Sequence, residues 1–234
     1  MESGLFRLPQ LLDLLDEGEP IVPPAEIVYS SAPRLCMASD GRAYVVKGPQ
    51  LEVVAAETVA HALAEIVELP VPKYALARDG DGARHFASRH IDGLRDITPF
   101  IAQNRALLAQ VVAFDVWLFN NDRNLGAFVM GPEGLVAIDF EKSRIIRSRT
   151  PTVEIPTLQP RTLWPRGELG QLMKGIAMPR DFLGKLENVS DSDIESAVRG
   201  VSAQLPEYTW SESTTFALTQ RRKKIRSLVK EVWP

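Results

Sequence analysis

The sequence is poor in cysteine, since Cys36 is the only one among 234 residues. A single thiol cannot form a disulfide within the chain, which excludes a disulfide-stabilised scaffold and fits a reducing compartment. No stretch approaches the roughly 18 consecutive apolar residues of a membrane span, so we expect no membrane partner. The N-terminus, with Glu2 and Asp13 among its first residues, lacks the basic start of a signal peptide. We therefore expect a soluble, cytoplasmic protein.

The chain also lacks a large excess of charge, because its formal net charge is -3 at neutral pH. Nucleic-acid binding normally depends on a broad basic face, so we do not expect a nucleic-acid partner. The local exception is a basic run at residues 221–224. It lies in a predicted helix, where such a run is typical of a solvated face.

The first part of the chain is predicted to be rich in strands. Apolar runs flank the Asp-Gly pair at 40–41, which tolerates the positive φ angles of a tight hairpin turn. We expect strands at about 34–39 and 42–48, a helix over 51–68, and a second hairpin around 79–82. Leucines at positions 5, 8, 11, 12, 14 and 15 predict a short amphipathic helix at the N-terminus.

The second part is predicted to be mainly helical. Thr98 can cap a long helix that runs to about Phe119, and a polar loop and a hairpin with strands at 128–130 and 135–139 follow. The stretch 143–169 lacks clear periodicity and predicts an extended loop. Further helices are predicted at 180–188, 191–199 and 211–231.

The change in texture along the chain predicts an α+β fold of two lobes. At this length the chain can form one large domain or two small lobes with a proper apolar core. We place an N-lobe at residues 1–92, which includes the N-terminal helix, and a helical C-lobe at 93–234. A cleft between two such lobes is a usual place for a ligand site.

Two acidic residues carry the chemistry of the sequence. Asp122 lies in the polar loop after the long apolar helix, and Asp139 follows the last strand of the hairpin. Either residue alone would fit a helix-terminal turn or a strand-end cap. Together they match the way in which phosphotransferases place a catalytic base and a magnesium ligand.

The Asn-Asn-Asp-Arg loop at 120–123, the following hairpin and Asp139 resemble the HipA-like kinases, and more distantly the phosphoinositide and protein kinases. The resemblance implies a two-lobed kinase-like fold with a small β-rich N-lobe. It also implies an ATP- and Mg²⁺-dependent transfer of the γ-phosphate to a hydroxyl acceptor, with a protein Ser or Thr among the acceptors. Asp122 would orient or deprotonate the acceptor, Asp139 would bind the metal, and Asp115 would hold the loop in shape.

The resemblance extends upstream and covers roughly residues 28–145. Lys47 ends the run Ala-Tyr-Val-Val-Lys, like the strand whose lysine contacts nucleotide phosphates, and Glu57 matches its acidic partner on the next helix. The residues by themselves leave alternatives open. Lys47 also fits a solvated edge residue, and Glu57 lies opposite the apolar stripe of its helix, as a solvated glutamate would.

A glycine-rich phosphate loop is absent, because Gly41 is the only glycine between Tyr29 and Lys47. This argues against an ordinary protein kinase, and HipA-like kinases are similar in lacking the loop. Ser30 and Ser31 could instead bring backbone N–H groups near the phosphates, and a plain polar loop is the alternative.

One position departs from the resemblance. An asparagine that binds magnesium is expected five residues after the catalytic Asp, and this chain has Ala127 there. Alanine offers no oxygen, so the metal contact is lost unless Asn124, Asn121 or water replaces it. A working enzyme with altered metal coordination, a slow enzyme and a nucleotide-binding pseudokinase are the three alternatives.

Several basic residues have two interpretations. Arg123 either binds phosphate or braces the loop. Arg144, Arg147 and Arg149 follow the metal-binding Asp, where they either meet an anionic partner or form a solvated loop. A small-molecule phosphotransferase of the aminoglycoside-kinase type is a further rival, but its loop usually carries a histidine before the Asp, where this chain has Asn121.

Overall fold

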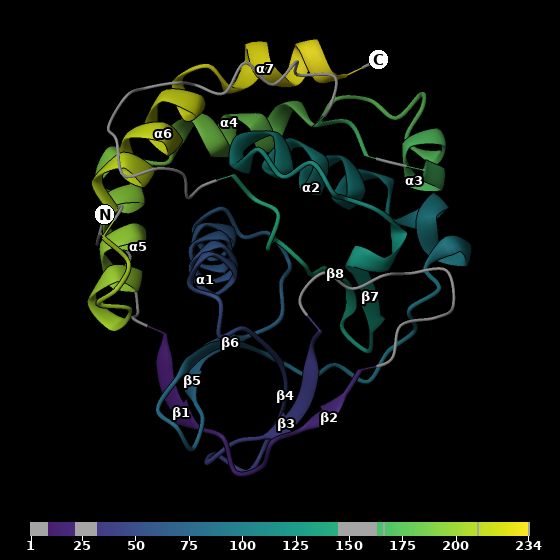
Figure 1. Cartoon of the computed structure of the whole chain (residues 1–234). Helices are drawn as coiled ribbons and strands as arrows, with labels where there is room; N and C mark the ends of the chain where they lie inside the picture. Colours follow the sequence, from purple (N-terminus) through teal and green to yellow (C-terminus); the bar gives the residue numbers. More distant parts are fainter. Residues whose placement is uncertain (1–8, 22–31, 145–162, 166, 210, 234) are drawn as a thin grey trace.

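The computed structural model describes residues 9–21, 32–144, 163–165, 167–209 and 211–233. The fold is α+β, with a mixed, curved sheet below a helical part (Figure 1). The six-stranded sheet has the order β1-β5-β6-β4-β3-β2. Its strands are β1 (Gln10–Asp13), β2 (Glu19–Pro20), β3 (Arg34–Met37), β4 (Ala43–Lys47), β5 (Tyr74–Arg78) and β6 (Arg84–Arg89).

Turn chemistry sets the two predicted hairpins of this sheet, and both are present. Gly41 has a φ of +75° in the turn between β3 and β4, and the Asp40 carboxylate accepts the Arg42 N–H. Asp79 closes the turn between β5 and β6 in the same way, through the N–H groups of Asp81 and Ala83. β4 pairs with β6 in antiparallel fashion, which places the end of β4 in the middle of the sheet.

The predicted N-terminal helix is wrong where the structure describes the chain. Gln10–Asp13 forms β1, which pairs in parallel with β5. Leu12 is buried, whereas Leu11 is 41% exposed, as expected when successive side chains of a strand point to opposite faces. A run of leucines fits a helix or a strand equally well, and the open edge of β5 favours the strand. The part of the prediction over residues 5–8 lies outside the described residues.

Helix α1 (Leu51–Ile66) matches the predicted helix and connects the two parts of the fold. It is buried along most of its length and contacts the sheet on one side and α5 (Asp191–Gln204) on the other (Figure 1). Because both faces are covered, the position opposite the apolar stripe is buried as well. The solvated alternative for Glu57 is therefore wrong, since its side chain has no exposed surface.

The long helix predicted from Thr98 is divided in two. Thr98–Gln103 forms the 3-10 helix η1, which Thr98 does not cap, and α2 (Arg105–Leu118) begins only after Asn104. Asn104 has a ψ of 15° and donates its amide to the carbonyl of Phe100, so it ends η1 and separates the two segments. Phe119 ends α2 in the left-handed conformation, at a φ of 56°.

The remaining elements follow the predicted order with two changes. The single helix expected over 211–231 is interrupted at Lys224, and α3 begins at Gly167, inside the stretch 143–169 that was predicted to be an extended loop. Residues 145–162 and 166 of that stretch lie outside the described residues. None of the described helices has the length and apolarity needed to cross a bilayer. These elements are η2 (Leu125–Ala127), β7 (Phe128–Gly131), β8 (Gly134–Ala137), α3 (Gly167–Leu172), α4 (Arg180–Asn188), α6 (Ser211–Lys223) and α7 (Ile225–Val232).

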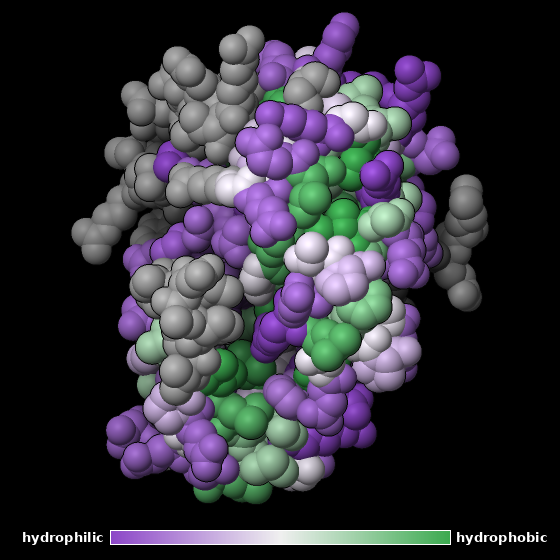
Figure 2. Space-filling view, turned by 90° about the vertical axis from the view of Figure 1, so that its right-hand side faces the viewer, coloured by the Kyte–Doolittle hydropathy of each residue, from purple (hydrophilic) through white to green (hydrophobic). Residues whose placement is uncertain are grey.

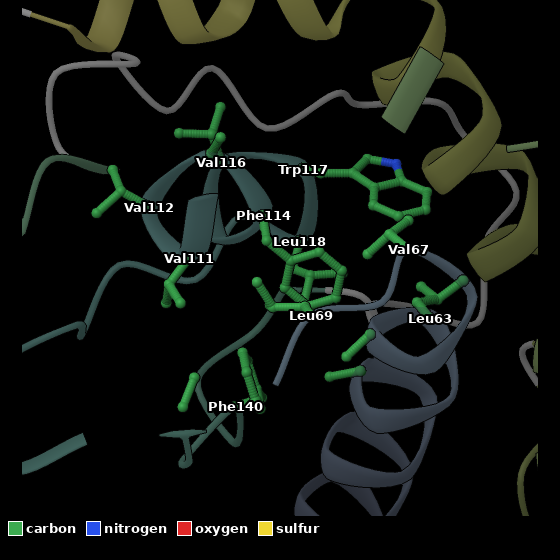
Figure 3. Close-up of a cluster of buried hydrophobic side chains, with 14 of the residues drawn as sticks. Leu63, Val67, Leu69, Val111, Val112, Phe114, Val116, Trp117, Leu118 and Phe140 are labelled. Carbon is green, nitrogen blue, oxygen red and sulfur yellow. The ribbon is translucent and has the colours of Figure 1, made fainter. Parts of the chain in front are cut away.

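One large hydrophobic core joins α1 to the helical part. Leu63 of α1 and Val67 directly after it lie on one side of this core, and Phe114 and Trp117 of α2 lie on the other (Figure 3). A second, smaller cluster around Leu12 lies within the sheet. The outer surface on the side of β7 and β8 intermixes hydrophilic and hydrophobic residues (Figure 2). The core therefore fixes α1 relative to α2 and to the loops that follow α2.

Candidate active site

Lys47 lies at the centre of the site. It ends β4, and its ammonium Nζ contacts Glu57 Oε1 at 2.6 Å and Asp139 Oδ1 at 2.8 Å. Its side chain is only 12% exposed, so it is not a solvated edge residue. The structure thus brings together three segments of chain, namely β4, α1 and the segment after β8.

The segment after β8 places two acids beside Lys47. Asp139 has a φ of +66°, a left-handed conformation that Asp adopts more readily than most residues and that is frequent at functional sites. Phe140 is fully buried between the two acids, and Glu141, which is 3% exposed, lies 3.4 Å from the Lys47 ammonium. Glu141 is not among the residues predicted from the sequence, where its only signal is that an acidic residue stands two positions after Asp139.

The charges in this cluster stabilise one another. Burial acts to lower the pKa of Lys47, but the carboxylates of Glu57, Asp139 and Glu141 raise it well above its usual value. Burial likewise acts to raise the pKa of Asp139, yet the Lys47 ammonium lowers it overall. For Glu57 the burial prevails, and its pKa is raised. Lys47 is therefore a firmly charged ammonium at neutral pH.

Arg123 braces the loop that carries Asp122. It is 1% exposed, and its Nε and Nη2 donate to both oxygens of the buried Asp115, at 2.6 and 2.9 Å. Its Nη1 donates to the carbonyls of Ala127 and Ile138, on the two sides of the hairpin. Every nitrogen of the guanidinium is thus used inside the protein, which excludes the phosphate-binding interpretation of Arg123.

Asp122 and Asn124 lie in the same loop. The catalytic role of Asp122 and the metal-binding role of Asn124 stay predictions. Asn124 Oδ1 accepts the Gly126 N–H at 2.9 Å, and its amide donates to the Asp122 carbonyl at 2.9 Å. Asn120 donates to the Asp115 carboxylate at 2.8 Å. Asn124 thus shapes the turn into η2, which ends at the buried Ala127.

A pocket opens between the sheet and the hairpin of β7 and β8. Its lining contains Lys47, Glu57 and Asp139, two arginines and several apolar side chains. A pocket that combines apolar side chains with a few converging charged groups is the usual form of a small-molecule site. The other lining residues are Val45, His61, Pro72, Phe86, Ser88, Arg89, Ile91, Arg95, Val129 and Ile138.

The basic run at 221–224 is only partly the solvated face that the sequence predicts, because Lys223 and Lys224 are exposed but Arg221 is not. Arg221 is 5% exposed and donates to the carbonyls of Leu118 and Arg144, at 3.3 and 2.9 Å. Its guanidinium also lies 3.9 Å from the ring centre of Phe119. It therefore joins the end of α2 to the segment that follows Asp139.

Some predicted residues lie outside the described part of the chain. These are Ser30 and Ser31, proposed near the phosphates, and Arg147 and Arg149 of the segment after Asp139. Their predicted roles stay predictions.

The comparisons with known proteins concern the same elements. A family model described as HipA-like kinase matches residues 28–146. No curated protein sequence matches the chain significantly. Among solved structures, the Helicobacter pylori proinflammatory kinase CtkA is similar, with a TM-score of 0.52 and 11% identity over 94% of this chain and 97% of that one. At this identity the likeness concerns the fold alone.

Two other structures are less similar. The FAT and kinase domain of CtTel1 has a TM-score of 0.42 and 12% identity, over 92% of this chain and 24% of that one. A MAP kinase from Leishmania major, LmaMPK10, has a TM-score of 0.29 and 13% identity, over 91% of this chain and 82% of that one. The fold comparison therefore rests on CtkA.

Proposed function

Since the chain belongs to the HipA-like kinase family, we propose that it is an ATP- and Mg²⁺-dependent kinase that transfers the γ-phosphate to a hydroxyl acceptor. The observation that carries this proposal is the ammonium of Lys47, which Glu57 and Asp139 hold at a pocket that is also lined by apolar side chains. Phosphoryl transfer depends mainly on positioning and on neutralising charge, and a buried, firmly charged ammonium supplies both.

The residues present fit a divalent cation. The carboxylates of Glu57, Asp139 and Glu141 each bring an oxygen to within 4.8 Å of the others, and oxygen ligands are those that Mg²⁺ prefers. Glu57 Oε2 is buried and has no hydrogen-bond partner within the described part of the chain. In this proposal Asp139 holds the metal, which when bound neutralises charge on the phosphates. Asn124 stays a candidate for a further contact.

The roles of the remaining groups follow from their positions. Lys47 binds and orients the phosphates, and Glu57 keeps the ammonium in place. Asp122 accepts the proton of the acceptor hydroxyl or orients it, from a loop that Arg123 and Asp115 hold rigid. We propose a protein serine or threonine as the acceptor and the cytoplasm as the place of action. The division into lobes at 1–92 and 93–234 is also part of the proposal.

Transfer of radiolabel from γ-labelled ATP tests this function. The purified chain is incubated with Mg²⁺ and model protein substrates, and autophosphorylation is followed by mass spectrometry. We expect transfer by the natural protein and a loss of about a hundredfold or more in Asp122→Asn and Asp139→Asn, since each removes a charged group at the reaction centre. Equal transfer by all three proteins would refute the proposed activity.

Ala127 favours a second candidate function, a pseudokinase that binds nucleotide without turnover and acts as an interaction module. Its buried methyl group supplies no metal ligand at this position. Stabilisation of the fold by ATP with Mg²⁺, without any transfer or hydrolysis, would support the pseudokinase and exclude the kinase.

A further inference from the structure

The cluster around Lys47 holds more negative charge than Lys47 can neutralise. Three carboxylates, those of Glu57, Asp139 and Glu141, lie within 3.4 Å of one ammonium. Lys142 approaches Glu141 at 3.7 Å, but its side chain is 46% exposed and its charge is screened by solvent. The side chains of Glu57 and Glu141 are almost fully buried, whereas that of Asp139 is 38% exposed and lines the pocket. Three carboxylates around one ammonium favour the binding of a second positive charge.

An orphaned atom points to the same conclusion. Glu57 Oε2 has no hydrogen-bond partner among the described residues, although its side chain is completely buried. The nearest cationic candidate on its own helix, His61, lies 3.7 Å away, and burial lowers the pKa of His61 to about 3, so it is neutral. The oxygen is therefore available to a cation or to a water that a cation holds.

The chemistry of the cluster selects the type of cation. Its ligand atoms are carboxylate oxygens, without the thiolates or imidazoles that softer metals prefer, which favours Mg²⁺ or Mn²⁺. Two other positions at which a metal ligand could be expected, 127 and 124, are less suited to this role. Ala127, whose carbonyl accepts the Ile138 N–H at 3.0 Å, has no side-chain oxygen, and the Asn124 oxygen accepts the Gly126 N–H.

The packing of the Phe140 side chain anchors the segment that carries Glu141. Phe140 is fully buried between Asp139 and Glu141, with its ring centre 5.7 Å from that of Phe114 and 4.7 Å from the Arg123 guanidinium. The two acids are therefore fixed on either side of an anchored residue. We propose that Glu141 is, together with Asp139, a ligand of the divalent cation that accompanies the nucleotide. This proposal rests on the proposed function and concerns the same site.

Binding of Mn²⁺ tests the proposal without any need for turnover. The affinity of the full chain for Mn²⁺ is measured by electron paramagnetic resonance in the presence of a non-hydrolysable ATP analogue. We expect Glu141→Gln to weaken Mn²⁺ binding by about tenfold or more, Glu141→Asp to weaken it less, and Asp139→Asn to weaken it strongly. The matched control is Glu133→Gln, the same change on the exposed turn of the same hairpin, which should leave the affinity unchanged.

A second measurement separates a metal ligand from a mere partner of Lys47. The affinity for the analogue alone is measured in EDTA. Because Glu141→Gln removes a negative charge near the phosphate site, metal-free binding should stay equal or become tighter. Equal losses with and without metal would overturn the proposal, as would wild-type Mn²⁺ affinity in Glu141→Gln.

The outcomes also separate this inference from the proposed function. If Asp139→Asn loses Mn²⁺ and Glu141→Gln does not, the kinase proposal stands and the role of Glu141 is refuted. If the natural protein binds neither Mn²⁺ nor the analogue, the proposed function fails and the role of Glu141 fails with it. Melting temperatures of all variants show whether each one is folded.

Discussion

At the scale of the residue, the protein uses buried charge to hold a loop. Arg123 and Asp115 are both about 1% exposed and form two hydrogen bonds, and Asn120 adds a third contact to the same carboxylate. A pair of this kind costs free energy to desolvate, and its loss leaves the remaining partner buried and uncompensated. Its consequence here is a fixed geometry for the loop that carries Asp122.

Replacing Arg123 by Leu is therefore expected to destabilise the fold by about 3–5 kcal/mol, because Asp115 stays buried without its cation. Equilibrium unfolding in urea measures the change. The control is Arg199→Leu, since Arg199 is 70% exposed and pairs with Glu195 on the surface of α5, and its loss should cost no more than about 0.5 kcal/mol. Similar values for the two variants would show that the buried pair is not structural.

His61 makes stability depend on pH. Its ring packs against Phe86 and Tyr74, and burial lowers its pKa from 6.5 to about 3. Between these two pH values the unfolded chain binds a proton at His61 that the folded chain does not bind. The contribution of His61 to the free energy of unfolding is therefore fully present above about pH 6.5 and is lost as the pH falls. At pH 5 the loss should be about 2 kcal/mol relative to pH 7.5, and His61→Phe should abolish this part of it.

The measurement is urea unfolding of both proteins at the two pH values. His90→Gln is the control, because its side chain is 30% exposed, and it should keep the pH dependence of the natural protein. An unchanged pH dependence in His61→Phe would contradict the prediction.

At the scale of the element, the C-terminal helix α6 contacts the end of α2, next to the loop that carries Asp122. Trp117 of α2 donates to the carbonyl of Leu218 in α6, and Arg221 of α6 donates to the carbonyl of Leu118. These contacts fasten the end of α2, from which the Asp122 loop starts. Arg221 also donates to the carbonyl of Arg144, but Lys47 and Asp139 contact each other directly. We therefore expect the loss of Arg221 to disturb the Asp122 loop more than the Lys47 site.

Arg221→Met is expected to lower the rate of phosphoryl transfer by about tenfold or more, because a small displacement of a reacting group has effects of this size. The affinity for the ATP analogue should stay unchanged, since Lys47 and Asp139 are held by other contacts. Steady-state kinetics and analogue titration measure the two quantities. Lys223→Met is the matched control on the exposed face of α6; an equal loss in both variants would argue against a positioning role.

At the scale of the whole molecule, one core connects the α1 helix of the first part with the helices of the second. The same hydrophobic cluster includes residues of α1, α2, α4, α5, α6 and α7, and Lys185 of α4 reaches Glu68 after α1 in an ion pair. Separate unfolding of the two parts would expose this shared apolar surface. The boundary at residue 92 stays a prediction, but the core predicts that both parts unfold together.

We therefore expect a single unfolding transition in urea. Far-ultraviolet circular dichroism reports on both parts, whereas tryptophan fluorescence reports on the second, because all four tryptophans lie after residue 116. The unfolding curves from the two methods should coincide. Two separated transitions would contradict the prediction.

ATP with Mg²⁺, at a hundredfold excess over its dissociation constant, should raise the free energy of unfolding by about 2.7 kcal/mol. EDTA should remove most of that gain.

The sequence by itself determined the local elements and the order of the acidic residues. The Asp-Gly turn before β4, the periodicity of α1 and the loop and hairpin between Asp122 and Asp139 depend on interactions between near neighbours, which a sequence pattern records. The α+β fold class and the family followed from these patterns.

Tertiary structure alone decided which side chains meet. Lys47 and Asp139 are 92 residues apart in the chain, and only the packing of the sheet against the hairpin brings them to 2.8 Å. The strand β1, the burial of Glu57 and the place of Glu141 depended in the same way on partners distant in sequence. Burial and pairing are properties of the surroundings of a residue, and periodicity along one element cannot report on surroundings that another element supplies.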